Sequence, residues 1–483
     1  MFDIYGKILK ILSPRERVQF YALIGLILIS GIADTVGVAS ILPFLAVVAN
    51  PETIQENEIL RSAYAWLEPA SQQVFLYWLG VAVCCAILGA LSIRVATLYA
   101  LARFANMRRY HIAKRLFEAY LRQPYDWFLR RHSSDLIKTI LQEVDQMMGG
   151  GGMPAMRILA QAVSVLFLLI FLIVVEPGIA IGAAVVLGGS YALNYMRVRR
   201  MLTRIGQERI AANTARNRVA NEAFGGIKDV KLMGLEDTHI NQFRRPAYRM
   251  ARIAMIQQVI AEVPRYSLEA ITFGGMIVVV LVLLQNGDGA LTSVLPILGL
   301  LGVAGLRILP ALQQVYHLLS LLRGGRPIFD LIVEELETLQ KSAAANAVVG
   351  AGKDQILKLD TELSLEDVVY AYPETNRSVL AGLSLTIPVN TTVGIVGGTG
   401  AGKTTAIDVL LGLLFPQSGT IKVDDTPVER KTLRAWQNNV GYVPQQIFLV
   451  DATVAANIAF GVPEHEIDLD AVERAARLAE LHD

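Results

Sequence analysis

The chain has 483 residues, of which 53% are hydrophobic and 18% are charged, and its net charge at neutral pH is +1. A charged share this far below the roughly 25% of an average soluble protein excludes a disordered chain and an ordinary soluble one. The near-zero net charge argues against nucleic acid as a partner, because such binders usually carry a net basic face. The two cysteines, Cys84 and Cys85, are adjacent in an apolar run, which excludes a disulfide framework and a CxxC metal site. The composition indicates an integral membrane protein with room for a soluble domain.

Six segments are long and apolar enough to cross a membrane, since a spanning helix needs about 20 apolar residues. These segments are Val18–Ala49, Val74–Leu101, Ala155–Val175, Gly178–Met196, Ile256–Leu284 and Ala290–Leu322. Residues 2–12 predict a short amphipathic helix on the inner surface rather than a cleavable signal. We therefore expect a six-helix α-helical transmembrane domain over residues 1–341.

Basic residues are concentrated on one side of these segments. Residues 102–154 hold nine Lys and Arg and residues 197–255 hold thirteen, whereas the loops on the opposite side hold only Arg61. Because cytoplasmic loops carry the excess of Lys and Arg, both termini and both long loops are predicted to be cytoplasmic. The chain is then a multi-pass protein of the inner membrane.

The long loops keep the helical spacing of apolar residues. Each has a break near its middle, one at Pro124 and one at Gly225-Gly226. We therefore interpret them as helical hairpins that extend the membrane helices into the cytoplasm. The outer loop is expected to hold a short helix from Ile59 to Leu67.

The pattern changes after the sixth segment. Residues 342–355 are rich in Ala, Gly and Asn and are interpreted as a linker. Short β-like runs alternate with turns from residue 356, which predicts a partial α/β P-loop domain over residues 356–483. The expected strands are Leu363–Val369, Ser384–Ile387, Thr392–Val396, Thr420–Val423 and Val440–Val443.

A glycine-rich loop follows the third of these strands and fits the phosphate-binding pattern GxxxxGK[ST]. Its glycines let backbone N–H groups face phosphate oxygens, and the N-terminus of the predicted helix Lys403–Leu414 adds a favourable partial charge. Lys403 is expected to reach the β- and γ-phosphates, and Thr404 to bind Mg²⁺. The predicted nucleotide-binding residues of the loop are Gly397, Gly398, Thr399, Gly400, Ala401, Gly402, Lys403 and Thr404.

Further motifs stand in a fixed order around the loop: Tyr370-Ala371-Tyr372, Gln417–Ile421, Gly441–Gln445 and Thr453–Ile458. With the loop, they resemble the nucleotide-binding domain of an ABC transporter behind an exporter-type membrane domain. The resemblance implies that Tyr372 stacks on adenine, that Thr405 helps to bind phosphate, and that Gln445 contacts Mg²⁺ and relays the nucleotide state to the membrane.

The same resemblance implies a homodimer of half-transporters with ATP and Mg²⁺ as cofactors, and coupling helices near 124–135 and 222–232. The sequence also departs from the family. It contains no LSGGQ-like signature, no strand ending in Asp-Glu after Gln445, and no later switch histidine. We therefore expect a truncated chain that binds ATP without the residues that hydrolyse it, and we assign no catalytic residue.

Three arginines fall inside the predicted spans, namely Arg94, Arg265 and Arg307. Each lies about 27 to 30 Å from the outer end of its helix, so they share one depth. Snorkelling to inner-leaflet head groups is one explanation, and an ion pair between Arg265 and Glu269 is another. A third explanation is a cluster that faces the cavity and binds an anionic head group, since guanidinium suits phosphate oxygens.

The sequence near these arginines carries a second resemblance. The segments Ala261–Glu269, Leu306–Pro310, Asp34–Val38 and Leu101–Phe104 are similar to bacterial flippases of lipid-linked oligosaccharides. This implies a polyprenyl-pyrophosphate-linked glycan as substrate, bound by Arg265 and Arg307 with Arg94 as a further contact, and the outer helix near the lipid tail. Prolines beside the two main arginines, Pro264 and Pro310, are expected to interrupt their helices.

Two alternatives remain open. The same scaffold suits an exporter of lipid A, drugs or peptides. A membrane protein that binds ATP only as a regulatory ligand is the alternative from a different class.

Overall fold

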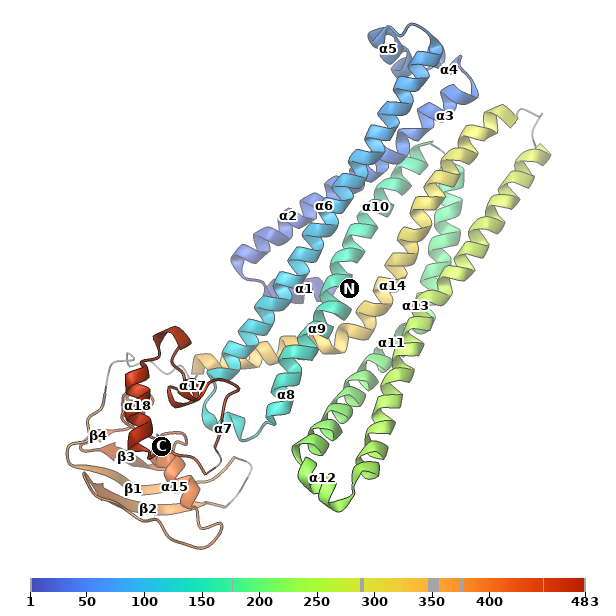
Figure 1. Ribbon diagram of the computed structural model, residues 1–483. Coiled ribbons are helices and arrows are strands. Elements are labelled where there is room, and N and C mark those ends of the chain that lie inside the picture. Colours follow the sequence, from blue (N-terminus) through green and yellow to red (C-terminus); the bar gives the residue numbers. More distant parts are fainter. Residues whose placement is uncertain are drawn as a thin grey trace. The chain divides into compact units, whose positions relative to one another are not determined.

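The computed structural model describes residues 2–175, 177–286, 291–345, 356–373, 375, 377–445 and 447–481. The chain divides into two compact units, Met1–Asn346 and Ala347–Asp483. Long helices build the first unit, and a small sheet with short helices builds the second (Figure 1).

Three helical segments among the described residues are long and apolar enough to cross a membrane: Pro14–Ala49, Gln72–Leu121 and Ser133–Val175. The third of them contains two π-helical turns, η1 (Thr139–Glu143) and η2 (Met148–Gly152). The helices of the first unit are α1 (Phe2–Ile11), α2 (Pro14–Ala39), α3 (Ile41–Ala49), α4 (Thr53–Glu56), α5 (Glu58–Leu67), α6 (Gln72–Leu121), α7 (Tyr125–Phe128), α8 (Ser133–Lys138), α9 (Val144–Met147), α10 (Met153–Val175), α11 (Pro177–Gly225), α12 (Ile227–Met233), α13 (Glu236–Asn286) and α14 (Leu291–Ala345).

Several helix positions confirm the sequence predictions. The expected short helices at 2–12 and 59–67 are present as α1 and α5. The breaks predicted at Pro124 and Gly225-Gly226 are where α6 and α11 end. Side chains fix two of the helix starts, because Ser13 forms a capping box with Glu16 at α2 and Asn57 caps α5.

The first predicted span is not one continuous helix. It divides at Ser40, between α2 and α3. Pro43 in the first turn of α3 explains the division, because its ring has no N–H and would clash with the carbonyl four residues earlier in a continuous helix.

The interruptions expected at Pro264 and Pro310 are also wrong. Helices α13 and α14 continue through both prolines. Proline is tolerated within such helices when neighbouring helices and local adjustments satisfy the freed carbonyl.

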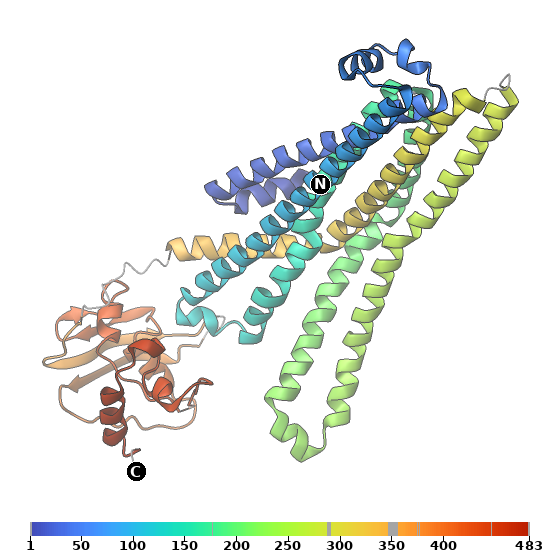
Figure 2. The same ribbon diagram turned by 45° about the horizontal axis from the view of Figure 1, so that its top comes forward.

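The helices of the first unit are arranged side by side. In both views α2 and α6 lie along one edge and α11 and α13 along the opposite edge, with α10 and α14 between them (Figures 1 and 2). Buried residues of α6, α9, α10 and α14 form one core that includes Leu116, Met147, Met156, Phe329 and Ile332. Glycines allow close helix contact at this core, since a Cβ on Gly325 of α14 would lie 2.5 Å from the carbonyl of Gly150 in η2.

The second unit contains one sheet of four antiparallel strands in the order β2-β1-β3-β4. Helix α15 packs on it, and their shared core includes Leu365, Val368, Val409, Leu414 and Ile421. The elements are β1 (Glu362–Tyr370), β2 (Leu380–Pro388), α15 (Lys403–Leu410), β3 (Ser418–Val423), β4 (Thr426–Pro427), α16 (Leu433–Gln437), α17 (Val454–Ile458), the short 3-10 helix η3 (Glu464–Glu466) and α18 (Leu469–Leu478).

Two predicted strands are absent from the described sheet, Thr392–Val396 and Val440–Val443. Both segments are irregular, and Val396 and Val443 are each 92% exposed. A strand exists only when a neighbouring strand accepts its backbone hydrogen bonds, and no described strand pairs with either segment. The β-type composition of these two segments was therefore not sufficient to predict a strand.

Two predicted boundaries also shift. Helix α15 ends at Leu410 rather than Leu414, because Gly412 takes a left-handed conformation with φ 67° that ends the helix. Helix α14 continues to Ala345, so the first four residues of the predicted linker 342–355 are helical. The rest of that segment, residues 346–355, lies outside the described residues.

Candidate functional site

The glycine-rich loop ends where α15 begins, and its backbone conformation requires glycine at two positions. Gly400 and Gly402 have φ of 80° and 91°, in the left-handed region that favours glycine. A Cβ on Gly402 would also lie 3.1 Å from the carbonyl oxygen of Val379 and from a methyl group of Leu380. The Gly402 carbonyl then accepts from the N–H of Ala406 at 2.9 Å, which starts the helix.

The side chain of Lys403 folds back over this loop. Its ammonium group donates to the carbonyl oxygens of Gly397 at 2.8 Å and Gly398 at 2.9 Å. The lysine is half-buried, so its charge is held at the loop rather than in bulk water. Because the first N–H groups of a helix have no acceptor within the helix, positive charge and free donors lie together at this end of α15.

A second contact brings a distant residue to the loop. The hydroxyl groups of Tyr372, which follows β1, and Thr405, on α15, are 2.9 Å apart. Thr405 is only 4% exposed, and Tyr372 is half-buried with its ring edge-on to Tyr370 at a centroid distance of 5.2 Å. The structure therefore places Tyr372 beside α15, the helix that follows the glycine-rich loop.

The structure does not test the two predicted Mg²⁺ ligands. Thr404 is exposed on the first turn of α15, and Gln445 is exposed in an irregular segment. No hydrogen bond joins Gln445 to another residue in the described part of the chain. The Mg²⁺ site of Thr404 and Gln445 therefore stays a prediction.

Three carboxyl groups of this unit, those of Glu366, Asp408 and Asp424, have shifted pKa values. Burial raises the pKa of Asp408 on α15. Asp424 accepts from the hydroxyl of Thr361 and from the N–H groups of Asp360, Thr361 and Glu362, and these bonds hold its pKa well below the usual range. Asp424 thus ties the start of β1 to the turn between β3 and β4 and has a structural role.

The residues that pack against the glycine-rich loop at Gly402 were not predicted from the sequence. Val379 and Leu380 lie against Gly402, and only their position at the start of β2 could have indicated this. The parts that were predicted fit the phosphates of a nucleotide. Among the described residues, the Lys403 ammonium bonds to carbonyl oxygens, which a more strongly charged phosphate oxygen can replace.

Of the three arginines within the predicted membrane spans, the structure describes the side chain of Arg94 alone. Arg94 is exposed on α6 and makes no ion pair or hydrogen bond with a described residue. Arg265 and Arg307 are on α13 and α14, but their side chains lie outside the described residues. Their proposed cluster is therefore not tested.

Comparison with known proteins gives two family matches. Residues 18–304 match the model of the ABC transporter transmembrane region, and residues 380–483 match that of the ABC transporter nucleotide-binding family, described as ABC transporter. The first match covers more than half of the chain. Together they agree with the division into a helical unit and a unit with the glycine-rich loop.

Three individual relatives are between 25% and 28% identical to this chain. The chain is 26% identical over 389 residues to an ATP-dependent lipid A-core flippase of Cupriavidus pinatubonensis, a match that covers 79% of this chain and 64% of that protein. It is 25% identical to the protein of that name in Cupriavidus metallidurans, over 89% of this chain and 77% of the relative. An uncharacterized ABC transporter ATP-binding protein of Sinorhizobium fredii is 28% identical over 84% of this chain and 68% of the relative. The chain thus spans less than two thirds of the first of these relatives.

Proposed function

The chain belongs to the ABC transporter family, and from this premise we propose that the protein is a subunit of an ATP-driven lipid flippase or exporter. The observation that carries the proposal is the loop at 397–404, with Lys403 held over it and Tyr372 bonded to Thr405. This loop belongs to a chain whose other unit contains helices apolar enough to cross a membrane.

The membrane arrangement forms part of the proposal. Six helices cross the inner membrane, and α11, α13 and α14, with 49, 51 and 55 residues, continue beyond it into the cytoplasm. The excess of basic residues in the loops 102–154 and 197–255 supports cytoplasmic termini. Two copies of the chain assemble as a homodimer, and ATP with Mg²⁺ binds between their nucleotide-binding units.

When bound, ATP would supply the binding energy that closes the paired units. The chain's own residues hold it: Lys403 binds the β- and γ-phosphates, Tyr372 stacks on adenine, and Thr404 and Gln445 bind Mg²⁺. Closure of the paired units around ATP then switches the membrane cavity from inward-open to outward-open.

Two amphipathic lipids are candidate substrates. A polyprenyl-pyrophosphate-linked oligosaccharide is favoured by the sequence around Arg265 and Arg307, with Arg94 as a further contact. Lipid A-core is favoured by the names of the relatives from both Cupriavidus species. Both candidates agree with a transporter that accepts a lipid-anchored sugar, and we favour the pyrophosphate-linked lipid because the segments around Arg265 and Arg307 resemble flippases of such lipids.

The direct test is transport in proteoliposomes that contain the purified protein. Each lipid is offered separately with a fluorescent label, and its movement between leaflets is followed with and without ATP. We expect ATP-dependent movement of the pyrophosphate-linked lipid, and its loss in Lys403→Ala. Movement of lipid A-core alone would replace the favoured substrate, and movement of neither lipid would contradict the flippase.

A further inference from the structure

A groove of about 480 Å³ lies between α2 and α6, along the edge of the first unit that these two helices form (Figures 1 and 2). This volume is in the range of small-molecule sites. The groove is lined by side chains of both helices, among them Ala22, Leu23, Leu26, Ala100, Arg103 and His111.

One end of the groove is apolar and the other is basic. Leu23 is buried, and Leu26 and Ala100 are half-buried. These three residues fall within the predicted spans Val18–Ala49 and Val74–Leu101, whereas Arg103 and His111 follow the end of the second span. A bond of 3.2 Å from Arg108 of α6 to Gln19 of α2 places the beginning of α2 beside this basic end.

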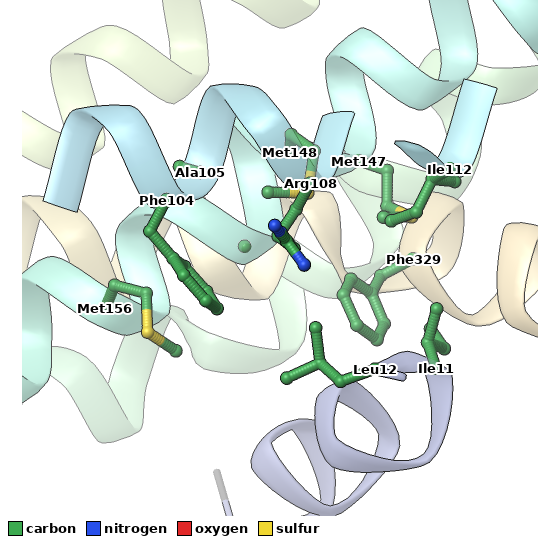
Figure 3. Close-up of a pocket in the computed structure, with 11 residues that line it drawn as sticks. Ile11, Leu12, Phe104, Ala105, Arg108, Ile112, Met147, Met148, Met156 and Phe329 are labelled. Atoms are coloured by element: carbon green, nitrogen blue, oxygen red, sulfur yellow. The ribbon is translucent and has the colours of Figure 1, made fainter. Parts of the chain in front are cut away.

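The third basic residue of the groove, Arg108, is already engaged. It forms an ion pair with Glu16, bonds to Gln19, and lies 5.2 Å from the centre of the Phe104 ring. Figure 3 shows its side chain directed between Phe104 and Phe329, into an apolar cavity of about 30 Å³. Arg108 thus neutralises Glu16, the carboxylate beside the groove.

Arg103 and His111 have no such partner. Both side chains are exposed, and neither forms an ion pair or hydrogen bond with a residue that the structure describes. The ring of His111 lies edge-on to that of the neighbouring Tyr110, at a centroid distance of 5.2 Å. The groove therefore offers two free donors, which lie about 12 Å apart along α6 at 1.5 Å per residue, and an apolar part lined by Leu23, Leu26 and Ala100.

We propose that this groove binds one anionic phospholipid of the inner leaflet, a site separate from the transported substrate. Arg103 and His111 donate to its phosphate, and one acyl chain lies along Leu23, Leu26 and Ala100. Anionic lipids are favoured because basic pockets between membrane helices attract their head groups, whereas a zwitterionic lipid adds a cation at the basic end. The depth of the site rests on the membrane orientation given under the proposed function.

Lipid binding to the purified full chain in an uncharged detergent tests the proposal. Phosphatidylglycerol and phosphatidylcholine with the same acyl chains are titrated separately, and retained lipid is counted by native mass spectrometry. We expect one retained phosphatidylglycerol at concentrations where phosphatidylcholine is not retained. Arg103→Gln is expected to weaken this binding about tenfold, equivalent to about 1.4 kcal/mol.

Two further variants make the result specific. Ala22→Trp fills the groove without changing its charge and is expected to weaken binding of phosphatidylglycerol. Arg122→Gln removes the same charge from an exposed position at the end of α6, outside the groove, and is expected to bind as the wild type does.

Equal retention of the two lipids, or wild-type binding by Arg103→Gln, would overturn the site. Inorganic phosphate that displaces the lipid at equal concentration would also overturn it, since the site would then bind phosphate without a lipid. Nucleotide binding through Lys403 is measured in the same samples. If the protein binds lipid but not nucleotide, only the proposed function is contradicted. If it binds nucleotide but not lipid, only the lipid site is contradicted.

Discussion

At the scale of single residues, Lys403 carries the nucleotide proposal. Its two bonds to loop carbonyl oxygens, at 2.8 and 2.9 Å, hold the ammonium group where it can exchange them for phosphate oxygens. Hydrogen bonds to charged groups contribute about 1.5–3 kcal/mol each. We therefore expect Lys403→Ala to weaken binding of a fluorescent ATP analogue by about tenfold or more. Lys358→Ala, which removes an exposed lysine of the same unit, is the control and should leave affinity unchanged. Equal affinities for the wild type and Lys403→Ala would refute the assignment.

Tyr372 allows the base and phosphate contributions to be separated. Its hydroxyl bonds to Thr405, whereas its ring is the part assigned to adenine. Tyr372→Phe keeps the ring and is expected to bind ATP as the wild type does. Tyr372→Ala should bind ATP about tenfold more weakly, because stacking of a base on an aromatic ring contributes about 1–3 kcal/mol. Competition with tripolyphosphate, which has no base, should be the same in all three proteins. If Tyr372→Ala binds ATP normally, the tyrosine only supports α15.

At the scale of elements, the glycines of η2 and α14 set how closely two helices approach. A Cβ on Gly325 would lie 2.5 Å from backbone atoms of Gly150, whereas a Cβ on Gly149 would have no neighbour within 4 Å. We expect Gly325→Ala to lower the free energy of unfolding by about 1–3 kcal/mol, the usual effect of overpacking. Gly149→Ala is the matched control, and its thermal midpoint in detergent should equal or slightly exceed that of the wild type. Equal midpoints for both variants would show that the two helices can separate without loss.

Element boundaries were predictable where a single residue determines them. Pro124 and Gly226 mark real ends of helices, and Asn57 supplies the cap of a helix expected from its apolar spacing. The division at Ser40 was missed although Pro43 causes it, because a proline in the first turn of a helix leaves the apolar pattern unchanged. A helix boundary that depends on local stereochemistry can therefore be predicted when the conformational preference of the proline or glycine is considered together with the apolar spacing.

Features that depend on distant partners were not predictable in this way. Val396 and Val443 have the composition of strands, but pairing is a property of two segments and neither finds a partner in the described sheet. The π-helical turns at 139–143 and 148–152 likewise depend on packing against other helices. The bond between Tyr372 and Thr405 was not predicted either, because the family resemblance assigned each residue to the nucleotide separately and said nothing of a contact between them.

At the scale of the whole molecule, the proposal assigns transport of the substrate to the first unit and binding of ATP to the second unit. An experiment can distinguish these two contributions. In the proposed function, the loop at 397–404 binds ATP through residues of the second unit. The same proposal assigns substrate selection to the first unit, where Arg265 and Arg307 belong to α13 and α14. A substitution that alters transport and leaves nucleotide affinity intact therefore identifies a substrate residue.

Lysine substitution of these two arginines makes that distinction. An arginine that only snorkels to lipid head groups tolerates lysine, because lysine snorkels as well. A guanidinium that binds a pyrophosphate through paired hydrogen bonds does not, since an ammonium group lacks that geometry. We expect Arg265→Lys and Arg307→Lys each to slow flipping of a pyrophosphate-linked lipid about tenfold in proteoliposomes, with ATP affinity unchanged. Arg244→Lys, at an exposed position of α13 in the predicted cytoplasmic hairpin, should flip at the wild-type rate. Wild-type rates in both test variants would make the arginines membrane anchors and would favour a general exporter over a flippase of pyrophosphate-linked lipids.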